Sequence, residues 1–157
     1  MRRQRVAAYA LVLRPLGGAG EEEVLLTQLS ERTTRPGAWT LPGGGLLHGE
    51  DPRGAVCREV REETGLDVTV GALLDVHSLH LEGVAPDGVL EDYHAIRLVF
   101  DAAVSPESPD PWVLEPEGTT ADARWVRIAD LEGGRLPHVG LVPWALERRA
   151  RSTPNGL

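Results

Sequence analysis

Three glutamates, Glu59, Glu62 and Glu63, lie within five positions of the chain. Their spacing would allow the carboxylates to act together. A helix turns about 100° per residue, so these carboxylates share one face within an arc of about 100°. Like charges at this spacing cost a helix a few tenths of a kcal/mol per close pair. On these residues alone, a solvated acidic surface is the more usual interpretation. The other is a site for a hard divalent cation, Mg²⁺ or Mn²⁺, which favours carboxylate oxygens and bridges to phosphates.

The flanking residues predict a helix with defined ends. Asp51 suits an N-cap, and Pro52 suits the first helical position, because proline lacks the N–H that is unpaired there. Gly65 suits a left-handed C-cap, so the helix is expected from Pro52 to Thr64. Before it, the glycine-rich segment 41–45 predicts a loop in which backbone closely approaches backbone, metal or phosphate. These flanks favour the cation site over the solvated surface.

The same residues resemble the signature of the Nudix hydrolases. The matching pattern is Gly44, five residues, Glu50, seven residues, then Arg58-Glu59-Val60-x-Glu62-Glu63-x-Gly65-Leu66, with agreement at every fixed position. The segment 39–44 also resembles the approach to this box. Nine fixed or class-restricted positions at set spacing are far more specific than a lone glycine motif.

The resemblance implies a magnesium or manganese site within the box. Glu59 and Glu63 are the expected direct ligands, and Glu62 is either a further ligand or the base that activates water. The carbonyl group of Gly43 or Gly44 is expected to complete the metal shell. A metal held there neutralises the oxygens of a pyrophosphate link and lowers the pKa of bound water.

Other residues of the box are expected to support this site. Arg58 resembles the family arginine that orients the catalytic glutamates, and Glu50 resembles its salt-bridge partner. Gly43 and Gly65 provide structural support at the two ends of the box. These four residues are therefore expected to act by positioning the carboxylates.

The general base is open to more than one assignment. Glu62 is one candidate, and Glu115 or Glu117, in the loop before the last strand, is the alternative. A carboxylate in such a loop is more often an ordinary solvated residue.

Three arginines are candidates for phosphate contacts. Arg32 and Arg35 lie in a polar loop, and Arg97 lies in the middle of a predicted strand among apolar neighbours. Arg97 is the favoured candidate because a guanidinium there needs a partner. A structural ion pair would satisfy it equally well.

The composition excludes several kinds of function. The chain of 157 residues has a net charge of −8, which disfavours stable binding to nucleic acid. It contains no lysine, so no lysine forms a Schiff base. No apolar run is long enough for a membrane span, and residues 1–13 suit a strand better than a signal peptide, so a cytoplasmic protein is expected. The single cysteine, Cys57, excludes an internal disulfide and is expected to be a buried thiol on the packing side of the helix.

The remaining pattern predicts several strands around one catalytic helix. Strands are expected at residues 4–13, 23–29, 38–41, 67–81, 93–103 and 121–128, a helical turn at 129–131 and a helix at 142–151. This mixture indicates an α/β class, which the resemblance sharpens to a Nudix-type α/β/α sandwich with a mixed β-sheet. A single domain is expected over residues 1–151, with a frayed tail over 152–157.

The leading hypothesis is a metal-dependent pyrophosphohydrolase, as the resemblance implies. Its expected partner is a small nucleoside diphosphate derivative (a nucleotide, sugar nucleotide or dinucleotide), and a second copy of the chain is a further candidate. One alternative is a catalytically silent Nudix-like regulator that binds a nucleotide, against which the complete glutamate set weighs. Another is an isomerase of isoprenoid diphosphates, which uses a catalytic cysteine, whereas the only cysteine here lies inside the box helix.

Overall fold

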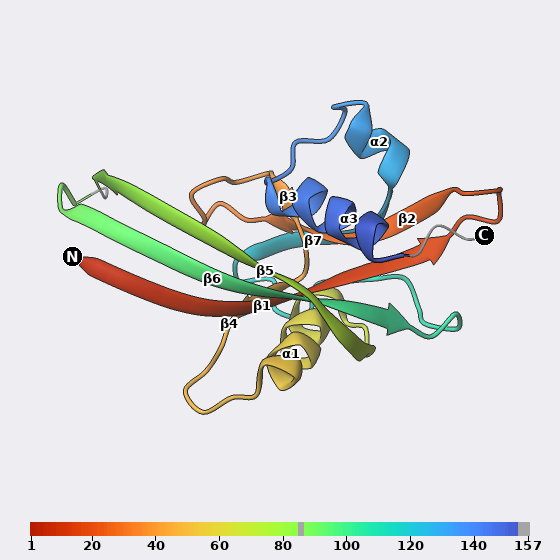
Figure 1. Ribbon diagram of the computed structural model, residues 1–157, viewed down its shortest axis with the longest axis horizontal. Coiled ribbons are helices and arrows are strands. Elements are labelled where there is room, and N and C mark those ends of the chain that lie inside the picture. Colours follow the sequence, from red (N-terminus) through yellow and green to blue (C-terminus); the bar gives the residue numbers. More distant parts are fainter. Residues whose placement is uncertain (85–86, 154–157) are drawn as a thin grey trace.

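The computed structural model describes residues 1–84 and 87–153, which form a mixed sheet with helices on both faces. The helices are α1 (Pro52–Thr64), α2 (Ile128–Glu132) and α3 (Leu141–Ser152). The strands are β1 (Arg2–Pro15), β2 (Glu22–Leu29), β3 (Trp39–Thr40), β4 (Gly43–Gly45), β5 (Val68–Val84), β6 (Leu90–Val104) and β7 (Thr120–Arg127). Figure 1 shows α2 and α3 above β1 and α1 below it.

The sheet is mixed, as predicted. Its main path runs β3-β2-β1-β6-β5, with β4 beside β1 and β7 beside β2. β1 and β6 pair in parallel, whereas the other strand pairs are antiparallel, including β1 with β2. The register of β5 shifts between Val70 and Asp75, around Gly71. The α/β/α sandwich expected from the sequence is therefore confirmed.

Helix α1 has the predicted bounds and caps. The Asp51 side chain accepts hydrogen bonds from the backbone N–H groups of Arg53 and Gly54 at 2.9 and 3.3 Å. Gly65 adopts the left-handed conformation with φ 71°, and its N–H bonds to the Arg61 carbonyl. The buried side of the helix consists of Ala55, Val56, Val60 and Thr64.

Two hydrophobic cores lie on opposite faces of the sheet. One contains Val56 and Val60 of α1 packed with Leu25 of β2. The other contains Val142 of α3 packed with Leu26, the next residue of β2. Because successive side chains of a strand point to opposite faces, β2 contributes to both cores and forms part of a buried middle layer.

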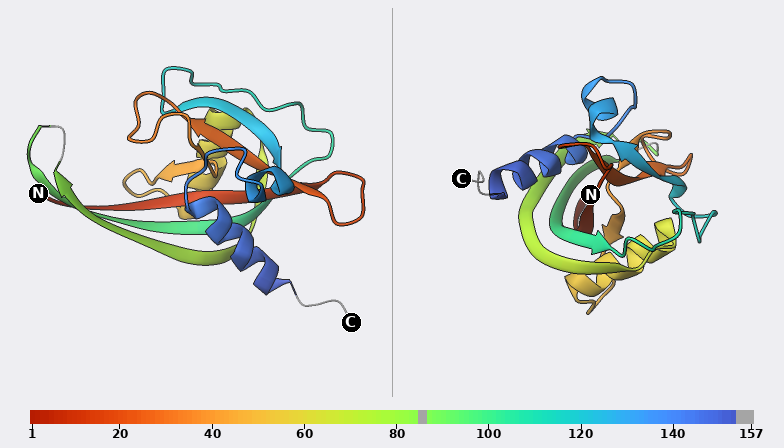
Figure 2. Two further views of the ribbon diagram at one scale, coloured as in Figure 1. Left: turned by 90° about the horizontal axis from the view of Figure 1, so that it is seen from above. Right: turned by 90° about the vertical axis from the view of Figure 1, so that its right-hand side faces the viewer.

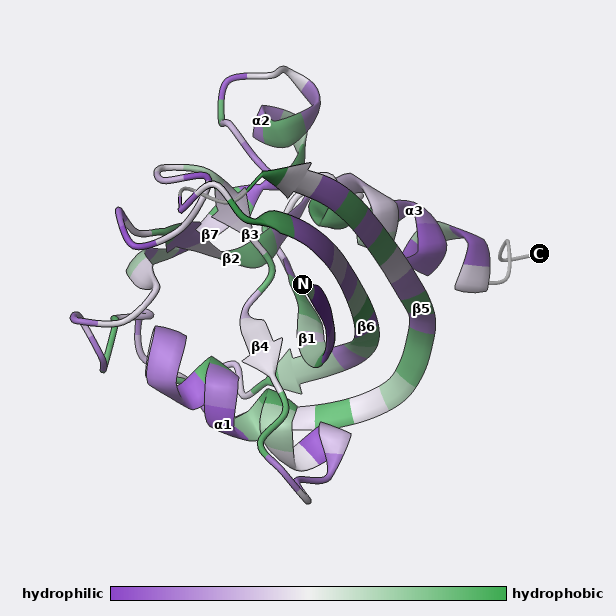
Figure 3. Cartoon of the chain, turned by 90° about the vertical axis from the view of Figure 1, so that its left-hand side faces the viewer, coloured by the Kyte–Doolittle hydropathy of each residue, from purple (hydrophilic) through white to green (hydrophobic). Residues whose placement is uncertain are grey.

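Strands β1, β5 and β6 extend and curve beyond the rest of the sheet. Figure 3 shows them as nested arcs, with hydrophilic and hydrophobic residues alternating along β5. Figure 2 shows the N-terminus near the C-terminal end of β5 and the N-terminal end of β6. There the Asp92 N–H donates to the Met1 carbonyl at 3.0 Å. Pairing with β1 thus extends β6 into the segment that was predicted as a loop.

Two expectations need correction. Cys57 is exposed, because the buried stripe of α1 lies on Val56, Val60 and Thr64 and leaves the next position at its edge. The tail does not begin at Ser152, which is the last residue of α3. Residues 154–157 of the predicted tail lie outside the described residues, and within the described residues no helix meets the length and apolarity required to span a membrane.

Candidate active site

Strand β4 shapes the site, because neighbouring groups occupy every position where a larger residue would place its Cβ. A Cβ on Gly43 would lie 2.3 Å from a carbonyl oxygen of β1, and one on Gly44 would lie 2.6 Å from Glu59 Oε1. A Cβ on Gly45 would lie 2.5 Å from Arg5 Nε. Successive Cβ directions alternate along a strand, so a carboxylate closes over one face of this bare strand and a guanidinium over the other.

Arg58 connects the carboxylates of α1 to the segments before it. Its Nε and Nη2 donate to the two carboxylate oxygens of Glu50 at 2.7 and 3.0 Å. Nη1 donates to Glu59 at 3.0 Å and to Glu62 at 3.2 Å, and Nη2 also donates to the Gly45 carbonyl at 3.2 Å. The side-chain hydrogen bond between Arg58 and Glu50 is the main cause of two shifts. It lowers the pKa of Glu50 to about 2 and raises the pKa of Arg58. Arg58 thus contacts Glu50, Glu59 and Glu62, and its orienting role stays a prediction.

Glu63 carries a carboxyl group that is withdrawn from water. Burial raises its pKa to about 8, and the neighbouring Glu59 adds to the rise. The Gly43 N–H, at 2.9 Å from Glu63 Oε2, and the Thr120 hydroxyl act in the opposite direction. Burial also raises the pKa of Glu59. Because burial disfavours the charged forms of both carboxyl groups, a divalent cation bound beside them would favour their ionisation.

The backbone register shows which carbonyl oxygen of β4 faces away from β1. The Ala10 N–H donates to the Pro42 carbonyl at 2.9 Å. Hydrogen-bonded pairs recur every second residue of an antiparallel ladder, so the Gly44 carbonyl faces β1. The carbonyls of Gly43 and Gly45 face away from β1, and the Gly45 carbonyl accepts a hydrogen bond from Arg58. Gly43 is therefore a better candidate than Gly44 for the predicted carbonyl ligand.

The loop between β6 and β7 is attached to the C-terminal end of α1. The Trp112 N–H donates to the Thr64 carbonyl at 2.9 Å, and the Leu114 N–H donates to the Glu62 carbonyl at 3.1 Å. These bonds satisfy carbonyl groups that a helix end leaves unpaired. The Trp112 ring also covers Gly65, where a Cβ would lie 2.8 Å from ring carbons. Gly65 thus allows the loop to pack against the helix.

The residues predicted as alternatives lie at the surface. Glu117 and Arg32, predicted for different roles, approach each other at 3.6 Å, with side chains 93% and 65% exposed. Glu115 is exposed, as is Arg35. Within the described part of the chain, neither arginine forms an ion pair with a carboxylate of α1. The catalytic role of the two glutamates and the phosphate-binding role of the two arginines remain predictions.

Arg97 is half-buried in β6, with its guanidinium carbon 6.0 Å from the centre of the Tyr9 ring. Among the described residues it forms no ion pair, so the structural pair considered as the alternative is not found there. Burial raises the pKa of Tyr9, whereas Arg97 and Arg5 lower it. Sequence reasoning missed Arg5 and Tyr9. Side chains alternate along a strand, so Arg5 and Tyr9 lie on the face of β1 opposite to that of Ala8. This alternation is the sequence signal that could have indicated that the two residues share a face.

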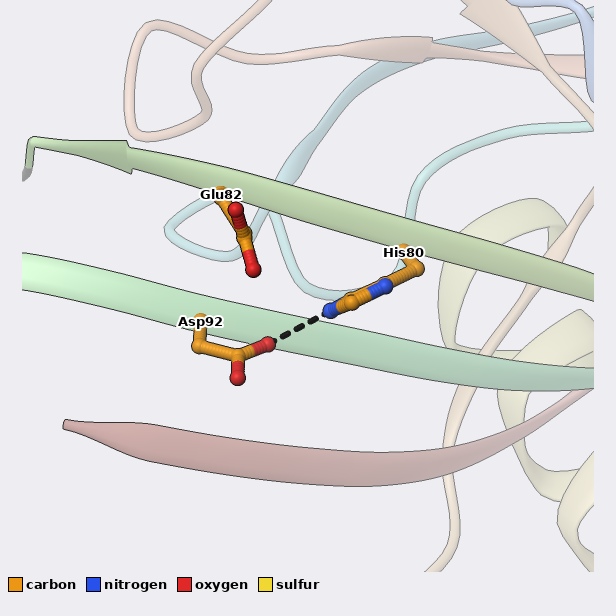
Figure 4. Close-up of side chains that lie close together, drawn as sticks. All are labelled: His80, Glu82 and Asp92. Carbon is orange, nitrogen blue, oxygen red and sulfur yellow. Dashed lines mark hydrogen bonds and ion pairs between the residues drawn. The ribbon is translucent and has the colours of Figure 1, made fainter.

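A second group of possible ligands lies apart from α1. Figure 4 shows His80, Glu82 and Asp92 near the far ends of β5 and β6, with their ligand atoms within 4.8 Å of one another. Nε2 of His80 lies 2.6 Å from Oδ1 of Asp92, which also pairs with Arg2 at 3.5 Å. These contacts explain the cluster as surface ion pairs, and we assign no metal to it.

A hollow of about 570 Å³ also lies away from the box, between α2 and α3. Leu131, Val142 and Leu146 contribute to its lining, together with Arg149. The carboxylates of α1 do not line it. The candidate active site is therefore defined by the side chains around β4 and not by this hollow.

Comparison with known proteins agrees with the geometry of the box. A family model described as NUDIX domain matches residues 3–145. An RNA pyrophosphohydrolase from Rhizobium meliloti (strain 1021) is 32% identical over 119 residues, covering 69% of this chain and 70% of the relative. Nudix hydrolase 26, chloroplastic, from Arabidopsis thaliana is 41% identical over 64 residues, which are 41% of this chain but only 25% of that relative.

A solved structure gives the same result. The MutT NUDIX hydrolase from Burkholderia pseudomallei superimposes with a TM-score of 0.66 at 28% identity, covering 93% of this chain and 98% of that chain. The family model matches nearly all of the described residues. The sequence relative from Arabidopsis and the solved structure are both named as Nudix hydrolases. Together these findings show that the chain belongs to the Nudix hydrolase family.

Proposed function

We propose that the chain is a metal-dependent pyrophosphohydrolase that cleaves the diphosphate linkage of a nucleoside diphosphate joined to another group. The observation that carries this proposal is the convergence of Glu59 and Glu63 on the bare glycine strand. Burial disfavours the charged forms of both carboxyl groups, and a bound cation would offset the free-energy cost of ionising them. The similarity to the Rhizobium RNA pyrophosphohydrolase supports a phosphoanhydride as the bond that is cleaved.

The donor groups fit magnesium or manganese. They are carboxylate oxygens of Glu59 and Glu63 and the carbonyl oxygen of Gly43, with Glu62 beside them. Hard divalent cations prefer such oxygen donors and share their remaining positions with water and phosphate. When bound, the metal neutralises phosphate charge and lowers the pKa of a coordinated water.

Residues of the box accept the proton of the attacking water and position the carboxylates. Glu62, whose side chain is 33% exposed, accepts the proton of the attacking water, since it is both accessible to solvent and adjacent to the metal ligands. Arg58 holds Glu59 and Glu62 in one orientation. Glu50 stays ionised at neutral pH because its pKa is about 2, and it holds Arg58 in place. Arg58 and Glu50 are positioning residues.

The proposal is tested by a magnesium-dependent hydrolysis assay on nucleotides, sugar nucleotides and dinucleotides. Glu62→Gln and Glu63→Gln are each expected to lower kcat by about 10²-fold or more, because each removes a charge needed for proton transfer or metal binding. Circular dichroism is expected to show an unchanged fold. Glu147→Gln, in an exposed ion pair of α3, is the matched control and should retain wild-type turnover.

The alternative bases are separated in the same assay. Glu115→Gln and Glu117→Gln are expected to keep most of the turnover, because both side chains are exposed at the surface. A large loss in either variant, with Glu62→Gln unaffected, would transfer the role of base to the loop. Tight nucleotide binding without hydrolysis of any substrate would support the silent regulator and refute the enzyme.

A further inference from the structure

Arg5 occupies an unusual place on the glycine strand. Its guanidinium lies over the peptide of Gly45, where an added Cβ would be 2.5 Å from Nε and 2.7 Å from Nη2. Gly45 is thus the third glycine of β4 whose missing side chain is filled by another residue. Gly44 makes room for Glu59 in the same way, on the opposite face of the strand.

The other arginines of β1 have carboxylate partners, whereas Arg5 has none among the described residues. Arg2 pairs with Asp92 at 3.5 Å, Arg3 pairs with Glu91 at 3.1 Å and Arg14 pairs with Glu23 at 2.7 Å. Arg97, on the neighbouring strand, also lacks such a partner within the described residues. Within the described residues, the guanidinium groups of Arg5 and Arg97 therefore have no carboxylate partner and are available to an anion.

The register places Arg5 and Arg97 around one small patch of the sheet. Arg5 is opposite Ala95 and Arg97 is opposite Ala7, and both alanines are 2% exposed. Alternation along β1 puts Tyr9 on the same face as Arg5. Arg5 and Arg97 therefore lie on the same face of the paired strands β1 and β6, two residues apart along the register.

This patch is electrostatically connected to the carboxylates of the box. Arg5 lowers the pKa of Glu59 and, together with Arg97, that of Tyr9. Glu63 raises the pKa of the same tyrosine. Cationic and anionic groups therefore lie within range of one another at the edge of β4, as a substrate with two linked phosphates requires.

We propose that Arg5, together with Arg97, binds the phosphoryl group of the diphosphate that is not held at the carboxylates of α1. The inference rests on the proposed function and adds a phosphate contact from the first strand. It assigns Gly45 the role of leaving space for the arginine. The guanidinium makes charge-assisted hydrogen bonds to phosphate oxygens, which are among the strongest in proteins.

The kinetic test compares Arg5→Gln with Arg5→Lys and the matched control Arg3→Gln. Arg5→Gln is expected to raise KM for the best diphosphate substrate by about 10- to 100-fold, with a smaller change in kcat, because a hydrogen bond to a charged group is lost. Arg5→Lys should restore part of the loss, since it keeps the charge without the planar fork. Arg3→Gln, two residues earlier on the same face, should behave as wild type.

A second measurement does not depend on turnover. Calorimetry with imidodiphosphate, a non-hydrolysable diphosphate, in the presence of Mg²⁺ should show about 10-fold or weaker binding to Arg5→Gln than to wild type. Binding of Mg²⁺ alone should change by less than about threefold, since the carboxylates remain. Equal imidodiphosphate affinity in Arg5→Gln and Arg3→Gln would overturn the proposal.

Gly45→Ala provides an independent variant if Arg5→Gln fails to fold. Gly45 has no positive φ, and the three atoms nearest to its added Cβ belong to the flexible end of Arg5, so the fold should accept alanine while the guanidinium is displaced. It should weaken imidodiphosphate binding as Arg5→Gln does, and unchanged binding would refute the role of Gly45. Wild-type binding without hydrolysis would refute the enzyme alone, whereas no wild-type binding would refute both proposals.

Discussion

The Glu63 carboxyl group is held between opposing influences. Burial and Glu59 favour its protonated form, whereas the Gly43 N–H and the Thr120 hydroxyl favour its ionised form. With a pKa of about 8, the group keeps its proton at neutral pH until a cation replaces it. If the proposed metal binds at Glu63, it competes with this proton.

This competition predicts that magnesium affinity rises with pH. Below about pH 8 the proton must leave Glu63 before a cation binds, so affinity should increase by about tenfold per pH unit and level off above that pH. Calorimetry in buffers of different ionisation enthalpy measures both the affinity and the proton released. Glu63→Gln should remove the dependence, and wild-type affinity that is constant from pH 6 to pH 8 would contradict the expectation.

At the scale of the element, the C-terminal end of α1 organises the loop that leads to β7. Gly65 ends the helix in a conformation that favours glycine and leaves space for the Trp112 ring. Backbone bonds from Trp112 and Leu114 then attach the loop to the helix. The next strand begins at Thr120, whose hydroxyl acts on Glu63. One helix cap thus connects the box to a residue far along the chain.

Gly65→Ala is expected to destabilise the fold more than Gly134→Ala does. Both positions have positive φ, 71° and 68°, so alanine costs about 1–2 kcal/mol at each. Only at Gly65 does the Cβ also collide with a ring, that of Trp112, whereas nothing lies within 4 Å of a Cβ on Gly134. Urea unfolding measures the difference. Equal losses in the two variants would show that the Trp112 contact adds nothing.

At the scale of the whole molecule, the sheet is a middle layer between two cores. Leu25 and Leu26 are adjacent and both fully buried, yet the first packs towards α1 and the second towards α3. Helix α1 is therefore supported by a sheet whose other face is covered as well. Loss of packing on either side should weaken the support of the site.

Leu25→Ala and Leu26→Ala are each expected to lower the free energy of unfolding by about 2–5 kcal/mol, because each leaves a cavity in a different core. Leu81→Ala is the control, with a side chain that is 53% exposed, and should cost less than about 1 kcal/mol. Chemical denaturation of the three variants provides the comparison. A loss below about 1 kcal/mol for either buried leucine would contradict burial of β2 on both faces.

The sequence alone determined the bounds of α1, the mixed α/β class and the family of the box. Its signals are local: Asp51, Pro52 and Gly65 act within one turn of the helix ends, and the apolar stripe needs only helical geometry. Only the tertiary structure decided which distant side chains close over the glycine strand, because contacts such as Arg5 on Gly45 depend on strand pairing. The exposure of Cys57 was likewise decided by how the helix is rotated against the sheet.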